Sequence, residues 1–81
     1  MDYDQDKVDE MTLALLYLNT SDRQEGFGAR AWKGFDWATM SRLHEKGFIS
    51  NPQSKAASIH VTEEGLKKSQ ELFQKYFGKN T

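Results

Sequence analysis

The chain has 81 residues and no cysteine, so it can form one domain and cannot be a disulfide-stapled secreted scaffold. A hydrophobic content of 37%, with two Trp, three Tyr and five Phe, excludes a disordered chain. The net charge of −1 gives no strong electrostatic footprint for nucleic acid, although residues 26–61 hold five bases against two acids and permit DNA binding.

Neither the N-terminal residues nor the apolar runs of the sequence predict membrane targeting. Residues 1–6 are acidic and lack the basic and apolar regions of a signal peptide. The longest uninterrupted apolar run, residues 13–18, is far too short to span a bilayer. We therefore expect a cytoplasmic protein.

The first predicted element is an amphipathic helix over residues 6–18. Its apolar positions recur at helical spacing, with Leu16 widening a stripe formed by Val8, Met11, Leu15 and Leu18. Asp4 or Asp6 is expected to cap the helix. The remaining early acids, Asp2, Asp9 and Glu10, are predicted to form a solvated helix start, because they lack the glycine and terminal glutamate of a calcium loop.

The pattern of residues 19–36 predicts no long regular element, and the most distinctive feature of the sequence is the aromatic and basic stretch over residues 30–37. A structureless loop of this length is rare in a compact domain, so a short helix over residues 29–33 is expected. The favoured interpretation places Trp32, Phe35 and Trp37 in the core, with both tryptophans mostly buried. The alternative is a partner or ligand surface anchored by Arg30, Trp32 and Lys33, since Trp and Arg are typical interface anchors.

A second long helix is predicted over residues 37–46, with Asp36 as its cap. Gly47 stands where a left-handed residue ends a helix, and Phe48 follows where it can contact Leu43 in a Schellman motif.

The face of this helix away from its apolar positions carries the candidate DNA-binding residues. Thr39, Arg42 and Lys46 could enter the major groove, where arginine pairs with guanine through two hydrogen bonds. Lys55, on the predicted wing, completes this candidate set. The alternative is an ordinary solvated helix face, and Asp36 and Glu45 weaken the DNA interpretation because they repel phosphates.

The remainder of the chain predicts a hairpin followed by a last helix. Residues 48–50 and 58–61 are the two strands, joined by a loose tip over residues 51–57. Thr62 caps the helix and Gly78 ends it. The apolar side chains of this helix exceed what one intramolecular face readily covers, so we expect a homodimer through the first and last helices: Leu66, Leu72, Phe73, Tyr76 and Phe77.

Two sets of motifs carry resemblances to known families. The segments 43–49 (Leu-His-Glu-Lys-Gly-Phe-Ile) and 59–65 (Ile-His-Val-Thr-Glu-Glu-Gly) resemble winged-helix regulators of the MarR and PadR families, which implies a DNA-binding domain with a two-stranded wing. The segments 31–37, 42–47 and 62–65 resemble a small bacterial family of unknown function over nearly the whole chain. That resemblance implies no activity, ligand or catalytic residue.

The predicted architecture is a single domain over residues 1–81. It is mainly α with a small β-hairpin and is winged-helix-like, with three to four helices and a two-stranded wing. Its two histidines, His44 and His60, match no metal or catalytic motif, so we expect a structural or solvated role for them, no cofactor and no enzyme activity. The expected function is a binding module, a DNA-binding transcriptional regulator; the alternative is a protein-interaction domain of the same fold that does not bind DNA.

Overall fold

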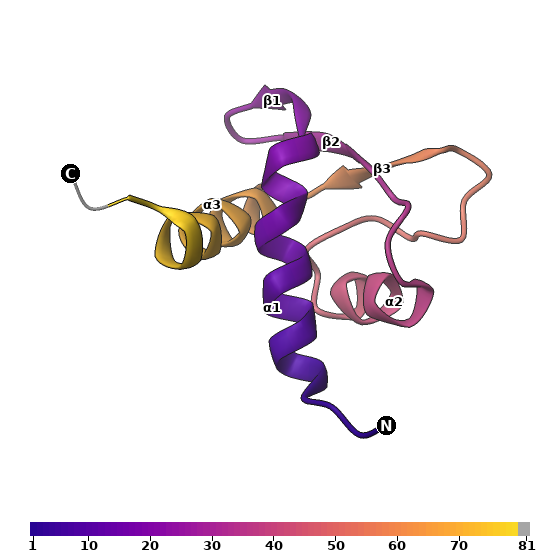
Figure 1. The fold of residues 1–81 in the computed structure, drawn as a ribbon. Helices are drawn as coiled ribbons and strands as arrows, with labels where there is room; N and C mark the ends of the chain where they lie inside the picture. Colours follow the sequence, from indigo (N-terminus) through magenta and orange to yellow (C-terminus); the bar gives the residue numbers. More distant parts are fainter. Residues whose placement is uncertain (80–81) are drawn as a thin grey trace.

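A computed structural model describes residues 1–79, so residues 80 and 81 of the predicted domain lie outside the described residues. Three helices lie on one side of a three-stranded antiparallel sheet, whose strand order is β1-β2-β3 (Figure 1). No helix within residues 1–79 has the length and apolar character needed to cross a membrane. The elements in chain order are α1 (Gln5–Leu16), the 3-10 turn η1 (Tyr17–Asn19), β1 (Ser21–Gln24), β2 (Gly28–Trp32), α2 (Trp37–Glu45), β3 (Ser58–Val61) and α3 (Glu63–Phe77).

The predicted helix starts are confirmed at their caps. The carboxylate of Asp4 accepts a hydrogen bond from the Lys7 amide at 3.1 Å, so Asp4 rather than Asp6 caps α1. Asp36 caps α2, and the hydroxyl of Thr62 caps α3. Each cap satisfies an amide that the first helical turn leaves without a partner. The last helix ends at Gly78 as predicted, in an extended conformation.

The predicted end of α2 is also confirmed. Gly47 has φ +81°, and its amide donates to the His44 carbonyl at 3.0 Å. The Phe48 amide donates to the Leu43 carbonyl at 3.1 Å, which completes the Schellman hydrogen-bond pattern. This turn sends the chain back along the sheet, where Ile49 forms a single bridge with Val61.

The short helix expected within residues 19–36 is wrong, because this stretch forms the β1–β2 hairpin. Ala29 and Ala31 alternate with outward-facing Arg30 and Trp32 and pack their small side chains on the core. Strand β1 (Ser21–Gln24) is exposed throughout, so it has no apolar alternation that would have revealed a strand.

The predicted two-stranded wing is part of a larger sheet. Strand β3 pairs along its length with β2, from Ala29 opposite Val61 to Trp32 opposite Ser58. On its other edge, residues 48–50 make only short contacts with residues 60–62, including the Ser50 amide to the His60 carbonyl at 2.8 Å. The structure thus contains three helices and a three-stranded sheet, and among residues 1–79 no helix precedes α2 in the arrangement of a helix-turn-helix.

The core lies between the inner face of the sheet and the three helices. It is formed by Leu13, Ala14, Leu16, Ala29, Ala31, Met40, Leu43, Ile49, Ile59, Val61 and Leu72. Close packing of α3 on the chain after Gly47 requires Gly65, where a Cβ would lie 2.0 Å from the Phe48 carbonyl oxygen. The expected burial of the two tryptophans is wrong: Trp32 is 59% exposed and Trp37 is 55% exposed. The core reaches its volume with aliphatic side chains from all three helices instead.

A buried carboxylate joins α1 to α2. Asp9 is only 1% exposed, so the solvated position predicted for it is wrong. Its oxygens accept hydrogen bonds from the Arg42 guanidinium at 2.9 and 3.0 Å and from the Lys46 ammonium at 2.8 Å. A carboxylate can be buried at this position because two cations from the neighbouring helix compensate for the water it loses.

We predict that Gly47→Val lowers the free energy of unfolding by about 1 kcal/mol or more, because a β-branched residue is strained at positive φ. A Cβ here would meet nothing closer than Glu64 Oε2 at 4.0 Å, so the cost comes from the backbone conformation. Gly47→Asn should cost less, since asparagine tolerates the left-handed region. Urea denaturation measures both variants, and equal losses would contradict this explanation.

We predict that Asp9→Asn lowers the free energy of unfolding by about 2 kcal/mol or more, because it leaves two cations facing a neutral side chain. The matched control is Asp6→Asn. Asp6 lies 3.5 Å from the same Lys46 ammonium but is almost fully exposed, so its loss should change stability by less than about 0.5 kcal/mol. Urea denaturation at neutral pH compares the two, and similar values would contradict a structural role for Asp9.

Candidate partner-binding surface

The outer face of the sheet is open and carries side chains of mixed chemistry. Because side chains alternate along a strand, the inward alanines of β2 set Arg30 and Trp32 outward. On β3, burial of Ile59 and Val61 sets Ser58 and His60 outward in the same way. The register pairs Arg30 with His60 and Trp32 with Ser58, so the four outward side chains form two cross-strand pairs.

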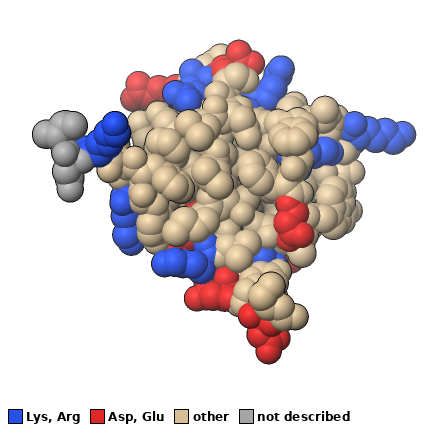
Figure 2. Space-filling view, in the orientation of Figure 1, with Lys and Arg blue, Asp and Glu red and all other residues tan. Residues whose placement is uncertain are grey.

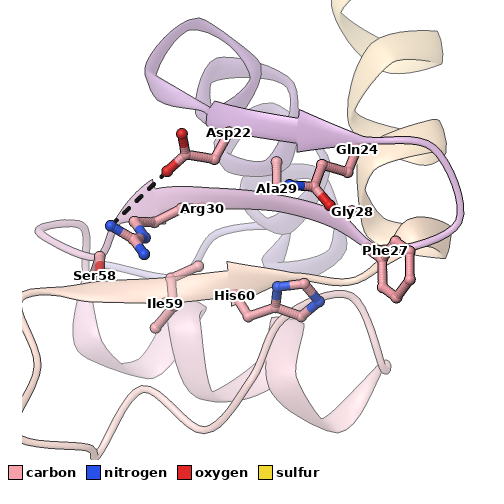
Figure 3. Close-up of a pocket in the computed structure, with 9 residues that line it drawn as sticks. All are labelled: Asp22, Gln24, Phe27, Gly28, Ala29, Arg30, Ser58, Ile59 and His60. Atoms are coloured by element: carbon pink, nitrogen blue, oxygen red, sulfur yellow. Dashed lines mark ion pairs between the residues drawn. The ribbon is translucent and has the colours of Figure 1, made fainter.

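An open groove of about 340 Å³ runs over this face. It is lined by Asp22, Gln24, Phe27, Gly28, Ala29, Arg30, Ser58, Ile59 and His60. Figure 3 shows Arg30 and Asp22 toward one end of the groove, with Phe27 and His60 toward the other. The guanidinium of Arg30 lies 3.8 Å from the Asp22 carboxylate, and both side chains are exposed. An exposed pair at this distance is weak, so Arg30 can exchange Asp22 for another acceptor.

Trp32 is held in place while its ring stays exposed. Its backbone amide donates to the Asn19 side-chain oxygen at 3.2 Å, which ties the end of β2 to the end of η1. The ring lies 6.5 Å from that of Phe35, and a Cβ at Gly34 would collide with it. Gly34 therefore makes room for the ring beside the strand. The arrangement presents a large, rigid apolar surface to a partner.

Lys33, the third member of the predicted partner surface, has a different role. Its ammonium donates to the carbonyl oxygens of Pro52, at 2.9 Å, and of Ser54. These contacts hold the loop over residues 51–57 against the end of β2. Of the three residues predicted to anchor a partner, the structure leaves Arg30 and Trp32 free to do so and uses Lys33 to fix a loop.

The candidate DNA-binding residues of α2 are engaged within the protein. Thr39 was expected on the solvated side of the helix, and this placement is wrong because Thr39 is fully buried. Its hydroxyl donates to Asp36 at 2.8 Å, which lowers the pKa of that carboxyl, and accepts from Arg42 at 3.2 Å. The hydrogen bond to Asp9 raises the pKa of Lys46. Lys55 is exposed on the loop of residues 51–57, and Lys46 is partly exposed although its ammonium is paired with Asp9.

The two histidines have different surroundings. His44 donates from Nδ1 to the Ile49 carbonyl at 3.0 Å and so secures the chain after α2. His60 is exposed and lines the groove on the sheet. Within the described residues, no three His, Asp or Glu side chains come close enough to hold a metal ion.

Sequence reasoning missed Asp22, Phe27 and His60 as members of this surface. Phe27 lies at the turn between β1 and β2. The alternation of residues 28–32 is a local signal for strand β2 and its outward side chains, but the exposed strand β1 has no such signal. The placement of His60 beside Arg30 depends on the pairing of distant strands, for which the sequence has no local signal.

Comparison with known proteins places the chain in a family. The uncharacterized protein y4hR of Sinorhizobium fredii (strain NBRC 101917 / NGR234) is 48% identical over 77 residues, which cover 95% of this chain and 97% of that protein. No solved structure matches the chain. Residues 4–79 match the family model "Domain of unknown function (DUF6429)". The predicted resemblance to a bacterial family of unknown function is thereby confirmed, and the chain belongs to the DUF6429 family.

Proposed function

We propose that this domain is a non-enzymatic binding module that recognises a protein partner through the outer face of its sheet. The observation that carries the proposal is the exposure of Trp32, 59%, on an ordered strand two residues from Arg30. Trp and Arg are the residues that most often dominate the energy of protein interfaces. A tryptophan held in this position by its strand loses little conformational freedom on binding.

The chemistry of the groove favours a protein over DNA as the partner. The groove combines the cation of Arg30, the carboxylate of Asp22, the amide of Gln24 and the ring of Phe27. Peptide groups and mixed side chains can satisfy all of these, whereas a phosphate backbone would be repelled by Asp22. The partner is therefore expected to present an acceptor for Arg30 and an apolar side chain for Trp32.

The binding of DNA by α2 remains a prediction with less support. In the usual winged-helix arrangement the recognition helix offers free side chains to base edges. Here Arg42 and Lys46 would have to leave the buried Asp9 carboxylate before they could contact DNA. The winged-helix comparison itself is supported by the order of α2, β3 and α3 and by the short contacts of residues 48–50 with residues 60–62. We also propose a cytoplasmic location, because small domains without cysteine are typical of reducing compartments.

The first test uses the two exposed tryptophans as a matched pair. The wild-type domain is used to capture proteins from a cell extract. The amount of the specifically captured protein should fall about tenfold or more with Trp32→Ala and should be unchanged with Trp37→Ala. Trp37 has similar exposure, 55%, but lies at the start of α2 rather than on the sheet. Quantitative mass spectrometry measures the capture. Equal losses with both variants would contradict a specific role for the sheet face.

The same experiment distinguishes binding of a protein partner from binding of DNA. DNA binding would be favoured if the domain captured nucleic acid, if Trp32→Ala left that capture unchanged, and if Lys55→Ala or added salt strongly reduced it. That outcome would contradict the proposal of a protein partner at the sheet.

We further predict that the Trp37→Phe variant, whose remaining tryptophan is Trp32, emits at the wavelength of a hydrated indole and is readily quenched by iodide. The physical reason is the exposure of the Trp32 ring on the strand. Addition of a captured partner should shift the emission to shorter wavelength and protect the ring from iodide. A short-wavelength, unquenched emission from the free protein would contradict the exposed placement.

A further inference from the structure

Helix α1 carries a second apolar surface on the side away from the core. The residues that α1 buries in the fold include Asp9, Leu13 and Leu16, which are spaced by four and three positions. The apolar stripe recognised in the sequence lies on the opposite arc. It consists of Val8, Met11 and Leu15 of α1 and Leu18 of η1, and we call these four residues the α1 stripe. Leu15 is 40% exposed and Leu18 is 67% exposed, while the other two are half-buried.

The α1 stripe lies in a surface with few charges. Figure 2, in the orientation of Figure 1 with α1 at the front, shows a broad uncharged face bordered by charged side chains. The charged side chains of α1 contact the neighbouring helices rather than this face: Asp6 and Asp9 lie against Lys46 at the end of α2, and Glu10 and Lys7 lie against α3. Glu10 accepts a hydrogen bond from the Tyr76 hydroxyl at 3.0 Å, and the Lys7 ammonium lies 5.4 Å from the centre of the Tyr76 ring. A helix that is apolar on both sides needs a second covering surface.

We propose that the α1 stripe binds a second copy of this chain, with the two α1 helices antiparallel across a twofold axis. The spacing of the stripe is symmetric: three, four and three residues separate its members. If the twofold axis passes beside Leu13, Val8 of each copy lies opposite Leu18 of the other, and Met11 of each copy lies opposite Leu15 of the other. This is the self-complementarity that a twofold interface requires, and an unrelated partner would have no reason to match it.

Charge also favours a second copy in this orientation. The start of α1 is acidic, with Asp2, Asp4 and Asp6. At the far end, η1 is next to one cation, because Arg23 donates to the Thr20 hydroxyl at 2.8 Å and to the Tyr17 carbonyl at 3.2 Å. Antiparallel helices bring the acidic start of each copy toward Arg23 of the other, and they also oppose the two helix dipoles favourably. A parallel pair would stack the acids of both copies together.

The interface is expected to be small and centred on α1. Helix α1 has 12 residues and is about 18 Å long, so the contact falls at or below the lower end of stable interfaces, about 600 Å² per partner. The last helix contributes less than its sequence predicts. Leu72 is buried, and Leu66 and Tyr76 pack on the core, which leaves Phe77 as its large exposed apolar side chain. This inference does not depend on the sheet-face proposal.

Sedimentation equilibrium at micromolar concentration tests the inference. The expected mass is twice 9.3 kDa at high concentration, with reversible dissociation on dilution. Leu15→Glu should weaken self-association by about tenfold or more, because the added charge is desolvated near the centre of the contact. The matched control, Phe27→Glu, makes the same change at an exposed ring on the hairpin turn and should leave the dimer intact. A monomer at all concentrations, or a dimer insensitive to Leu15→Glu, would overturn the proposal.

Disulfide trapping tests the orientation, and the absence of native cysteine makes it direct. The double variant Val8→Cys/Leu18→Cys should form a covalent dimer under mild oxidation. Within one chain the two positions are about 15 Å apart, too far for an internal disulfide. Each single cysteine variant should remain unlinked, because positions 8 and 8 of the two copies are also separated by about 15 Å. Efficient linking of the single variants would indicate parallel helices and would overturn the antiparallel arrangement.

Discussion

The buried carboxylate of Asp9 determines how α1 sits in the molecule. An ionised group can leave water only where other charges and donors replace it, and here Arg42 and Lys46 do so from α2. Asp9 shares its side of the helix with Leu13 and Leu16, so the ion pair and the core contacts select the same rotation of α1. Rotation toward the more continuous apolar stripe would carry Asp9 into solvent and leave both cations without their partner.

This constraint explains why the sequence pattern of α1 misleads about its buried face. Hydrophobic periodicity alone favours the face of Val8, Met11, Leu15 and Leu18, because the other face contains an aspartate. The fold buries the face with the aspartate. Asp9 is buried because it pairs with Arg42 and Lys46, which lie 33 and 37 positions further along the chain. No local window of the sequence contains both partners. The same pairing removes Arg42 and Lys46 from the solvated face that a recognition helix would need.

Local chemistry was predictable, and long-range pairing was not. The caps at Asp36 and Thr62 and the left-handed Gly47 follow from backbone groups within a few residues, so the ends of α2 and the start of α3 could be placed from the sequence. The β1–β2 hairpin could not, because its edge strand is wholly polar and the inward positions of β2 are alanines. For the candidate surface, Arg30 and Trp32 could be identified by residue type alone, while their placement together on the outer face, with Arg30 in the groove, depends on the sheet.

The small inward side chains of β2 also account for the exposed tryptophan. With Ala29 and Ala31 facing the core, the sheet approaches α3 closely, and no space remains on that side for an indole. The period of a strand then commits Trp32 to the opposite face. Trp32 and the α1 stripe thus reach the surface for different reasons: one by the pleat of a strand, the other by the charge pairing of a helix. Because neither contributes to the ion pair or the inward face of the sheet, each surface can be altered without disturbing the contacts that fix the fold.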